Sequence, residues 1–247
     1  MKTASLLERY KPAIRRLPHG RDLTRQDLLT DAFRMTAEGR IAMYYAPHNE
    51  WINDSAKVVI LGITPGWTQM KIAFQAVRDG LDEGCTDEEV LRRAKREAGF
   101  AGTMRQHLIG MLDCLGLQNE LCIESSADLF GERASLLHTT SLLKYPVFAG
   151  ERNYTGANPD ILASALLRGQ ALSSLEELKE LPDALLIPLG KAVERVLRWL
   201  ADQGHFAGQR VLWGFPHPSG ANGHRQRQFE ENKEKMQTIF TEFFRER

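Results

Sequence analysis

A histidine between two prolines stands where an apolar segment of the chain ends. Val211 to Phe215 is an apolar run suited to a buried strand, and Pro216, His217, Pro218 and Ser219 follow it directly. The prolines stiffen the exit from the strand and hold one imidazole at its tip. An imidazole held there can donate a hydrogen bond or exchange a proton with a ligand. A histidine that only caps a turn is the alternative, and the two flanking prolines favour the first interpretation.

A second apolar run also ends in a loop of glycine and proline. Lys57 to Ile63 predicts a strand, and the sequence Gly62-Ile63-Thr64-Pro65-Gly66 closes it. The carboxyl ends of parallel strands meet at one edge of a sheet, which is where such sheets bind ligands. We therefore expect this loop and the His217 loop to form one pocket.

Strands that alternate with helices predict the fold that must position these loops. The strands are apolar throughout, which is typical of a parallel sheet covered on both faces. The sequence thus predicts an α/β fold, a three-layer α/β/α arrangement around a central, mainly parallel four-stranded sheet. The strands are expected at 57–63, within 134–143, and at 184–189 and 211–215, and helices at 69–77, after Thr86, and at 104–115, 191–203 and 227–244.

Two further segments have predicted roles. Residues 1–43 are expected to form a helical extension on a main domain of residues 44–247, because Thr24 and Asp27 resemble a capping box that opens a helix at 28–33. Lys144 to Pro159 is too long for a tight connection and is a candidate functional loop, with Asn158 and Pro159 starting the next helix.

Composition restricts the partners of the chain. Lys plus Arg equals Asp plus Glu at 32 each, so DNA binding would need a local patch of charge. Cys85, Cys114 and Cys122 are odd in number and lack C-x-x-C spacing, which favours reduced core residues over disulfides or a cysteine-built zinc or iron-sulfur site. No apolar signal core or membrane span is recognisable. We expect a soluble, cytoplasmic, monomeric protein without cofactor or metal.

The two loops together resemble the motifs of the uracil-DNA glycosylase superfamily. Its first motif is a G-x-x-P loop, matched by residues 62–66, and its second is an H-P-S loop, matched by 217–219. The segments 136–146 and 185–197 resemble its second strand and its third strand with the following helix. Either loop alone also occurs as an ordinary turn, but both stand on the expected elements. The resemblance covers residues 44–247.

The resemblance implies an enzyme that flips a nucleotide out of DNA and cleaves its N-glycosidic bond. His217 matches the histidine that donates a hydrogen bond to the departing base. Gly66 stands where the uracil-only branch has a tyrosine that blocks pyrimidine C5, which implies a wider pocket for a substituted base. The implied substrate-binding residues are Gly62, Ile63, Pro65, Gly66, Trp67, His138, Thr139 and Ser219.

Two departures from the family pattern affect the expected chemistry. Thr64 stands where most branches have Asp or Asn, and its hydroxyl can orient water but cannot take a proton at neutral pH. His217 and Thr64 are the catalytic candidates, and Asp54, Asp79 and Glu151 are equivalent guesses for a base. The asparagine that reads uracil on the second strand is absent; His138, Thr139, Thr140 or Ser141 stands there. His138 reads the base or is a buried structural histidine, and Trp67 stacks on a base or packs at the rim.

The loop after His217 is the expected contact with DNA. Small residues and cations there would press against phosphates or wedge into the duplex, although a solvated loop is the simpler alternative. The basic run at 92–96 is interpreted as a solvated helix face rather than a phosphate patch. The DNA-binding candidates are Pro218, Gly220, Ala221, Asn222, His224, Arg225 and Arg227.

These features favour a DNA glycosylase that acts on a modified pyrimidine, a 5-substituted or glucosylated cytosine rather than plain uracil. Such an enzyme would serve DNA repair or defence against phage with modified DNA. A catalytically inactive member that binds DNA or a nucleotide is the second hypothesis. An unrelated small-molecule hydrolase is the third, because a fold alone does not define a function.

Overall fold

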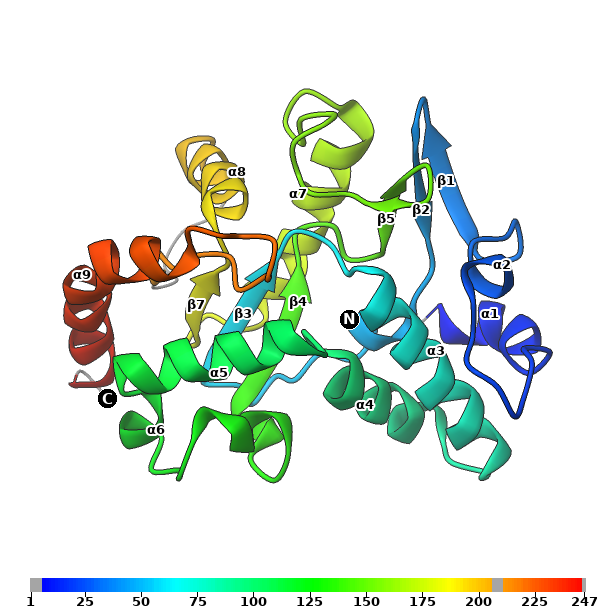
Figure 1. The fold of residues 1–247 in the computed structure, drawn as a ribbon, viewed down its shortest axis with the longest axis horizontal. Helices are drawn as coiled ribbons and strands as arrows, with labels where there is room; N and C mark the ends of the chain where they lie inside the picture. Colours follow the sequence, from blue (N-terminus) through cyan, green and yellow to red (C-terminus); the bar gives the residue numbers. More distant parts are fainter. Residues whose placement is uncertain (1–5, 206–210, 246–247) are drawn as a thin grey trace.

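A parallel sheet of three strands lies at the centre of the computed structural model, which describes residues 6–205 and 211–245 (Figure 1). Its strands are β3 (Val58–Gly62), β4 (Leu137–Ser141) and β7 (Leu185–Pro188), in the order β4-β3-β7. Both pairings are parallel. The prediction of an α/β fold with a parallel sheet between helices is confirmed.

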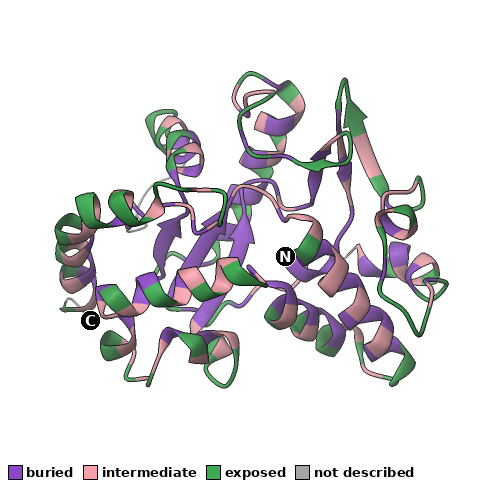
Figure 2. Ribbon diagram, viewed as in Figure 1, coloured by how far each residue is buried: buried purple, intermediate pink, exposed green. Residues whose placement is uncertain are grey.

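Side chains of this sheet alternate between two cores, as the pleat of a strand requires. Val58 and Ile60 of β3 pack with helices α5 (Thr103–Leu115) and α9 (Arg225–Arg245). Val59 and Leu61 belong to the other core. Figure 2 shows the three strands buried from end to end. The second core contains residues of α3 (Trp67–Asp82), α4 (Asp87–Ala98), α7 (Ala165–Lys179) and α8 (Lys191–Asp202).

The predicted fourth strand forms only one β-bridge within the described residues. Val211 bridges Leu186 of β7 in parallel. The Leu212 N–H donates to Leu186 O at 2.8 Å, and the Gly190 N–H donates to Phe215 O at 2.8 Å. The segment 211–215 therefore runs beside β7, where the prediction placed it, without completing a regular ladder.

A second sheet was not predicted from the sequence. It consists of β1 (Arg34–Glu38), β2 (Ile41–Tyr44), β5 (Val147–Ala149) and β6 (Arg152–Asn153), paired antiparallel in that order. The expectation of a wholly helical extension is wrong for 34–43, because buried Ile41 and Met43 alternate with the half-buried Ala42 and Tyr44 and Gly39 makes the turn at φ +57°. Only α1 (Leu7–Ile14) and α2 (Arg25–Leu28) are helical there.

Helix ends follow the predicted signals with one exception. The capping boxes at Thr24 and Thr86 are both present, and α5 ends at Gly116 with φ +92°. However, α7 begins after Ser164, whose Oγ accepts from the Leu167 N–H at 3.2 Å, and not at Asn158 and Pro159. The remaining short elements are α6 (Leu117–Glu120), η1 (Pro47–Asn49), η2 (Ser126–Phe130) and η3 (Ala134–Leu136).

The cysteines are free, but only Cys85 is partly buried. Cys114 and Cys122 are exposed, so the expectation of core cysteines is wrong for these two; each lies on the outer side of its segment. None of the helices within 6–205 and 211–245 is long and apolar enough to span a membrane.

The capping box of α4 predicts a measurable contribution to stability. Thr86→Ala removes the hydroxyl that accepts from the Glu89 N–H, and we expect it to lower the free energy of unfolding by about 1 kcal/mol. Thr68→Ala, at an exposed position in α3, should change it by less than about 0.5 kcal/mol. Urea unfolding measures both, and equal effects would contradict the role of the cap.

Candidate functional site

A pocket of about 430 Å³ lies at the carboxyl ends of the parallel strands. Ile63, Thr64 and Gly66 line it from the loop after β3, and His217 and Ser219 line it from the loop after 211–215. The two loops therefore meet in one pocket, as their positions in a parallel sheet predict. The other lining residues are Gln69, Met104, Asn153, Tyr154, Thr155, Leu189, Gly190, Lys191, Ala192, Ala221 and Asn222.

His217 is held in the protonation state that donates into this pocket. The Ser219 N–H donates to its Nδ1 at 3.2 Å, so the proton of the neutral ring lies on Nε2. Burial lowers the pKa of His217 below its ordinary value. The ring is therefore neutral at physiological pH and presents an Nε2–H donor.

Gly190, which follows β7 and Leu189, makes the position of His217 possible. Its φ is +85°, and a Cβ built there would lie 2.9 Å from the Cβ of His217. A side chain at this position would push the histidine away or strain the turn. The small residue between β7 and α8 is thus required by the loop that carries the imidazole.

Two helices begin at the pocket. Gly66 precedes α3 and Gly190 precedes α8, and Gln69 and Lys191 from their first turns line the wall. First-turn N–H groups lack intrahelical acceptors and carry partial positive charge. None of the lining residues is Asp or Glu. The pocket is therefore suited to an acceptor-rich or anionic group.

The candidate acids of the sequence lie outside this pocket. Asp54 and Glu151 are exposed, and Asp79 accepts from the guanidinium of Arg78 at 2.7 Å. Nothing in their placement brings a carboxylate to the His217 side chain. The structure thus offers no general base among the three.

Thr64 lines the pocket, but its hydroxyl fastens two loops together. It donates to Tyr145 O at 2.9 Å and accepts from the Val147 N–H at 3.0 Å. Its proton is therefore already committed, and one lone pair remains for a ligand or water. The geometry favours a role in holding the loop before β5.

Asn153 occupies much of the space that Gly66 leaves open. The Trp67 N–H donates to Asn153 Oδ1 at 3.0 Å, and a Cβ built on Gly66 would lie 3.1 Å from Asn153 Nδ2. Because residue 66 is glycine, the side chain of Asn153 from β6 can lie there. It reduces the space beside Gly66 in which we expected a substituent on the pyrimidine to fit. Asn153, Tyr154 and Thr155 come from the predicted functional loop 144–159.

Five predicted substrate-binding residues do not line the pocket. Gly62 lies against the ring of Phe100: a Cβ built on Gly62 would lie 3.2 Å from Phe100 Cε1. Pro65 is buried. Trp67 packs in the core under the guanidinium of Arg25, 4.7 Å from the ring centroid, which is the rim-packing alternative. Thr139 contacts Gly99, and His138 lies elsewhere in the fold.

His138 belongs to a buried polar cluster made with Asn53, Lys95 and Glu177. The Asn53 N–H donates to His138 Nδ1 at 3.3 Å, so Nε2 donates to Glu177 Oε1 at 2.6 Å. Burial, together with the charge of Lys95, lowers the pKa of His138 to about 4, although the hydrogen bond to Glu177 opposes the shift. The structural alternative is therefore correct for His138, because its side chain lies on the buried face of β4.

Lys95 also corrects the expectation of a wholly solvated basic run. It is 6% exposed, its Nζ donates to Trp51 O at 2.9 Å, and burial lowers its pKa to about 7. Arg92 of the same run is exposed and pairs with Glu88 at 2.7 Å, as expected for a solvated face.

The predicted DNA-binding loop is folded around His217. Ala221 and Asn222 line the pocket, and Asn222 Nδ2 donates to His217 O at 3.1 Å. Arg225 donates to Ser219 O at 3.0 Å, and Arg227 pairs with Glu231 at 3.5 Å. The other three DNA-binding candidates do not line the pocket. Gly220 and His224 are exposed, and Pro218 is buried, with its carbonyl oxygen 2.9 Å from His107 Nδ1.

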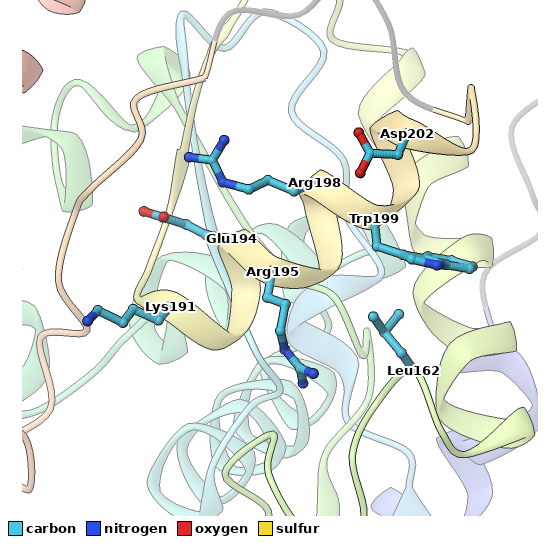
Figure 3. Close-up of a pocket in the computed structure, with 7 residues that line it drawn as sticks. All are labelled: Leu162, Lys191, Glu194, Arg195, Arg198, Trp199 and Asp202. Carbon is cyan, nitrogen blue, oxygen red and sulfur yellow. The ribbon is translucent and has the colours of Figure 1, made fainter.

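A second hollow, of about 420 Å³, lies on the outer side of α8 (Figure 3). The charged side chains around it point in different directions and are mostly engaged within the protein. Arg195 pairs with Asp160, Glu194 accepts from the Gly214 N–H at 2.5 Å, and Arg198 lies over Trp213 at 4.0 Å. This hollow therefore offers no convergent set of groups for chemistry.

Comparison with known proteins gives one relative. The chain is 46% identical over 241 residues to a protein of Bacillus subtilis (strain 168) described as uncharacterized protein YoxB, and the match covers 97% of this chain and 93% of that protein. No family model and no solved structure matches the chain.

The buried histidine His48 predicts a loss of stability in acid. Neither of its ring nitrogens has a hydrogen-bond partner in the described part of the chain, and burial lowers its pKa to about 3. The unfolded chain binds this proton near pH 6.5 and the folded chain does not, so stability falls as pH decreases from 6.5 toward 3. The slope from one such group is about 1.4 kcal/mol per pH unit.

His48→Leu should flatten this dependence by that amount between pH 6 and 4, measured by urea unfolding at each pH. The control His224→Gln changes an exposed histidine and should keep the slope of the unmodified protein. Equal slopes in all three proteins would refute the assignment.

Proposed function

We propose that this chain, which belongs to the same protein family as YoxB of Bacillus subtilis, is a DNA glycosylase. In this proposal it hydrolyses the N-glycosidic bond of a modified pyrimidine that is flipped out of DNA into the His217 pocket. The biological setting would be DNA repair or defence against phage with modified DNA.

The observation that carries the proposal is the convergence of donors without any acid. His217, whose neutral ring carries its proton on Nε2, and residues of the first turns of α3 and α8 line a pocket that no Asp or Glu lines. When the glycosidic bond breaks, its electron pair leaves with the base, which becomes anionic. Preorganised donors at that position stabilise the charge, and one of them can contribute roughly 10²- to 10³-fold in rate.

The fold supports the same proposal. The segment 211–215 lies beside β7 and extends the order β4-β3-β7 at its edge. The loops that resemble the two glycosylase motifs, 62–66 and 217–219, then both leave carboxyl ends of strands. We propose on this basis a uracil-DNA glycosylase-like arrangement of four strand positions.

The proposed mechanism depends on the departing base more than on the attacking water. Water adds to the sugar C1′ after the C–N bond breaks, and its proton passes to the departed base anion or to solvent, because no carboxylate lines this pocket. The Thr64 hydroxyl has one lone pair left to orient that water. A reaction in which the C–N bond is largely broken before water adds needs least help from a base, and this is the course that the pocket would favour.

The proposed substrate is a 5-substituted pyrimidine in preference to plain uracil, with glucosylated cytosine among the candidates. The asparagine that pairs with uracil in the resembling family is absent from β4, and Thr139 and Ser141 are buried there. Purified protein would be incubated with single- and double-stranded DNA that carries uracil, 5-substituted cytosines and uracils, or glucosylated cytosine. Abasic product from a modified base supports the proposal, and none from any substrate rejects it.

A non-catalytic protein that binds DNA or a nucleotide in the same pocket is the second candidate. The lack of a lining carboxylate and the committed proton of Thr64 favour it. It differs from the enzyme in one outcome: DNA would bind without conversion of any substrate under single-turnover conditions.

His217→Ala tests the leaving-base role directly. We expect the single-turnover rate of excision to fall about 10²- to 10³-fold, because the Nε2–H donor is lost, while affinity for DNA stays within about threefold. His224→Ala, which changes an exposed histidine of the same loop, is the matched control. A His217→Ala rate equal to that of the control would exclude the role.

Lys191 provides a test of the DNA contact. It is exposed, lines the pocket mouth and forms no ion pair with any residue of the described ranges. If it neutralises one phosphate, Lys191→Ala should reduce the slope of log K against log salt by about 0.7 to 0.9. Lys179→Ala, on the paired face of α7, should leave the slope unchanged.

A further inference from the structure

Two carboxamides on the α3 side of the pocket are fixed by backbone N–H groups. The Phe100 N–H donates to Gln69 Oε1 at 3.2 Å, and the Trp67 N–H donates to Asn153 Oδ1 at 3.0 Å. A backbone N–H can only donate, so each amide must turn its oxygen toward it. The NH₂ group of each side chain is therefore the part left for a ligand.

The two residues lie at different depths of the same wall. Gln69 is 7% exposed, and Asn153 is exposed at the mouth. Phe100, which holds Gln69, is itself in the left-handed region at φ +51°, so the hydrogen bond helps to keep a strained residue in place. Asn153 lies so close to Gly66 that a Cβ on residue 66 would be only 3.1 Å from Asn153 Nδ2.

The other polar side chains of the pocket do not change the character of this wall. Thr64 keeps one lone pair after its bonds to Tyr145 O and the Val147 N–H, and Ser219 Oγ accepts from the Ala221 N–H at 3.1 Å. Asn222 donates Nδ2 to His217 O and Gln228 Oε1, and its Oδ1 accepts from the His224 N–H. A ligand group that faces the NH₂ groups of Gln69 and Asn153 must itself accept hydrogen bonds.

We propose that Gln69 and Asn153 are specificity-determining residues, which read a carbonyl oxygen at C4 of the flipped pyrimidine and reject an amino group there. This inference rests on the proposed glycosylase function and narrows its substrate class to 5-substituted uracils before 5-substituted cytosines. An amino group at C4 would face the NH₂ groups of the two side chains, and none of these donors would find an acceptor. We expect this to favour excision of the uracil derivative over the cytosine derivative by about 10- to 10²-fold.

The test compares two substrates that differ at C4, and consequently in the proton on N3, and are otherwise the same. DNA with 5-hydroxymethyluracil or with 5-hydroxymethylcytosine is incubated with the unmodified protein, Gln69→Glu and Asn153→Asp under single-turnover conditions. Both variants keep the oxygen that accepts from the backbone and replace the NH₂ donor by an acceptor. We expect the unmodified protein to excise the uracil derivative about 10- to 10²-fold faster, and Gln69→Glu to lower that ratio at least about tenfold.

The ratio of rates separates recognition from general effects of charge. A new carboxylate near the departing anion slows both substrates, so a common decrease does not alter the ratio. Asn119→Asp adds the same charge at an exposed position in α6, away from the pocket, and should keep the original ratio. Equal excision of both bases by the unmodified protein, or an unchanged ratio in both variants, overturns the proposal.

Binding distinguishes a failure of this inference from a failure of the proposed function. If the unmodified protein excises neither base, the side-chain amide NMR signals of Gln69 and Asn153 decide the inference, and the enzymatic proposal is rejected only when none of the other DNA substrates is excised either. These signals are assigned by their absence in the two variants and followed during titration with each free base. Shifts with 5-hydroxymethyluracil alone support the reading, whereas no shift or equal shifts with both bases overturn it.

Discussion

The close approach of Gly190 to the backbone at His217 is the constraint on which the pocket depends. The Gly190 N–H bonds to Phe215 O, and the missing side chain lets the histidine lie against the turn. The same turn begins α8, so one residue joins the end of β7, the start of a helix and the loop that carries the imidazole. The tautomer of the ring is then set by the next turn, through the Ser219 N–H. Position and protonation of His217 are therefore both consequences of backbone geometry.

The sequence predicted what depends on local chemistry and on the rules of parallel sheets. Apolar runs located β3 and β7, and strand ends located the meeting of the 62–66 and 217–219 loops. The hairpin of β1 and β2 was missed because β1 buries no residue fully and β2 buries only Ile41 and Met43, a weak signal beside the capping box at Thr24. Helix α7 was placed too early because Pro159 resembles a helix start.

Long-range contacts explain the errors at the site. His138 has the residue type of a ligand-binding group, and only the packing of α7 against the sheet shows that its partner is Glu177 of that helix. Gly66 predicted a wider pocket, and only the pairing of β5 with β6 brings Asn153 into the space beside this glycine. Gln69 had no recognisable signal, because its role depends on a hydrogen bond to Phe100, 31 residues away. Contacts of this kind are invisible to motif and periodicity.

The Asn153 contact has a consequence for how this protein can diversify. His217 and the starts of α3 and α8 follow strands of the parallel sheet. Asn153, whose side chain lies at the pocket mouth, belongs instead to the second sheet, which has the order β1-β2-β5-β6 and includes the N-terminal hairpin β1-β2. Changes of length or register in that outer sheet would reposition the mouth while the strand ends stay fixed. Changes in these hairpins can therefore alter which ligands fit at the mouth while His217 and the starts of α3 and α8 keep their positions.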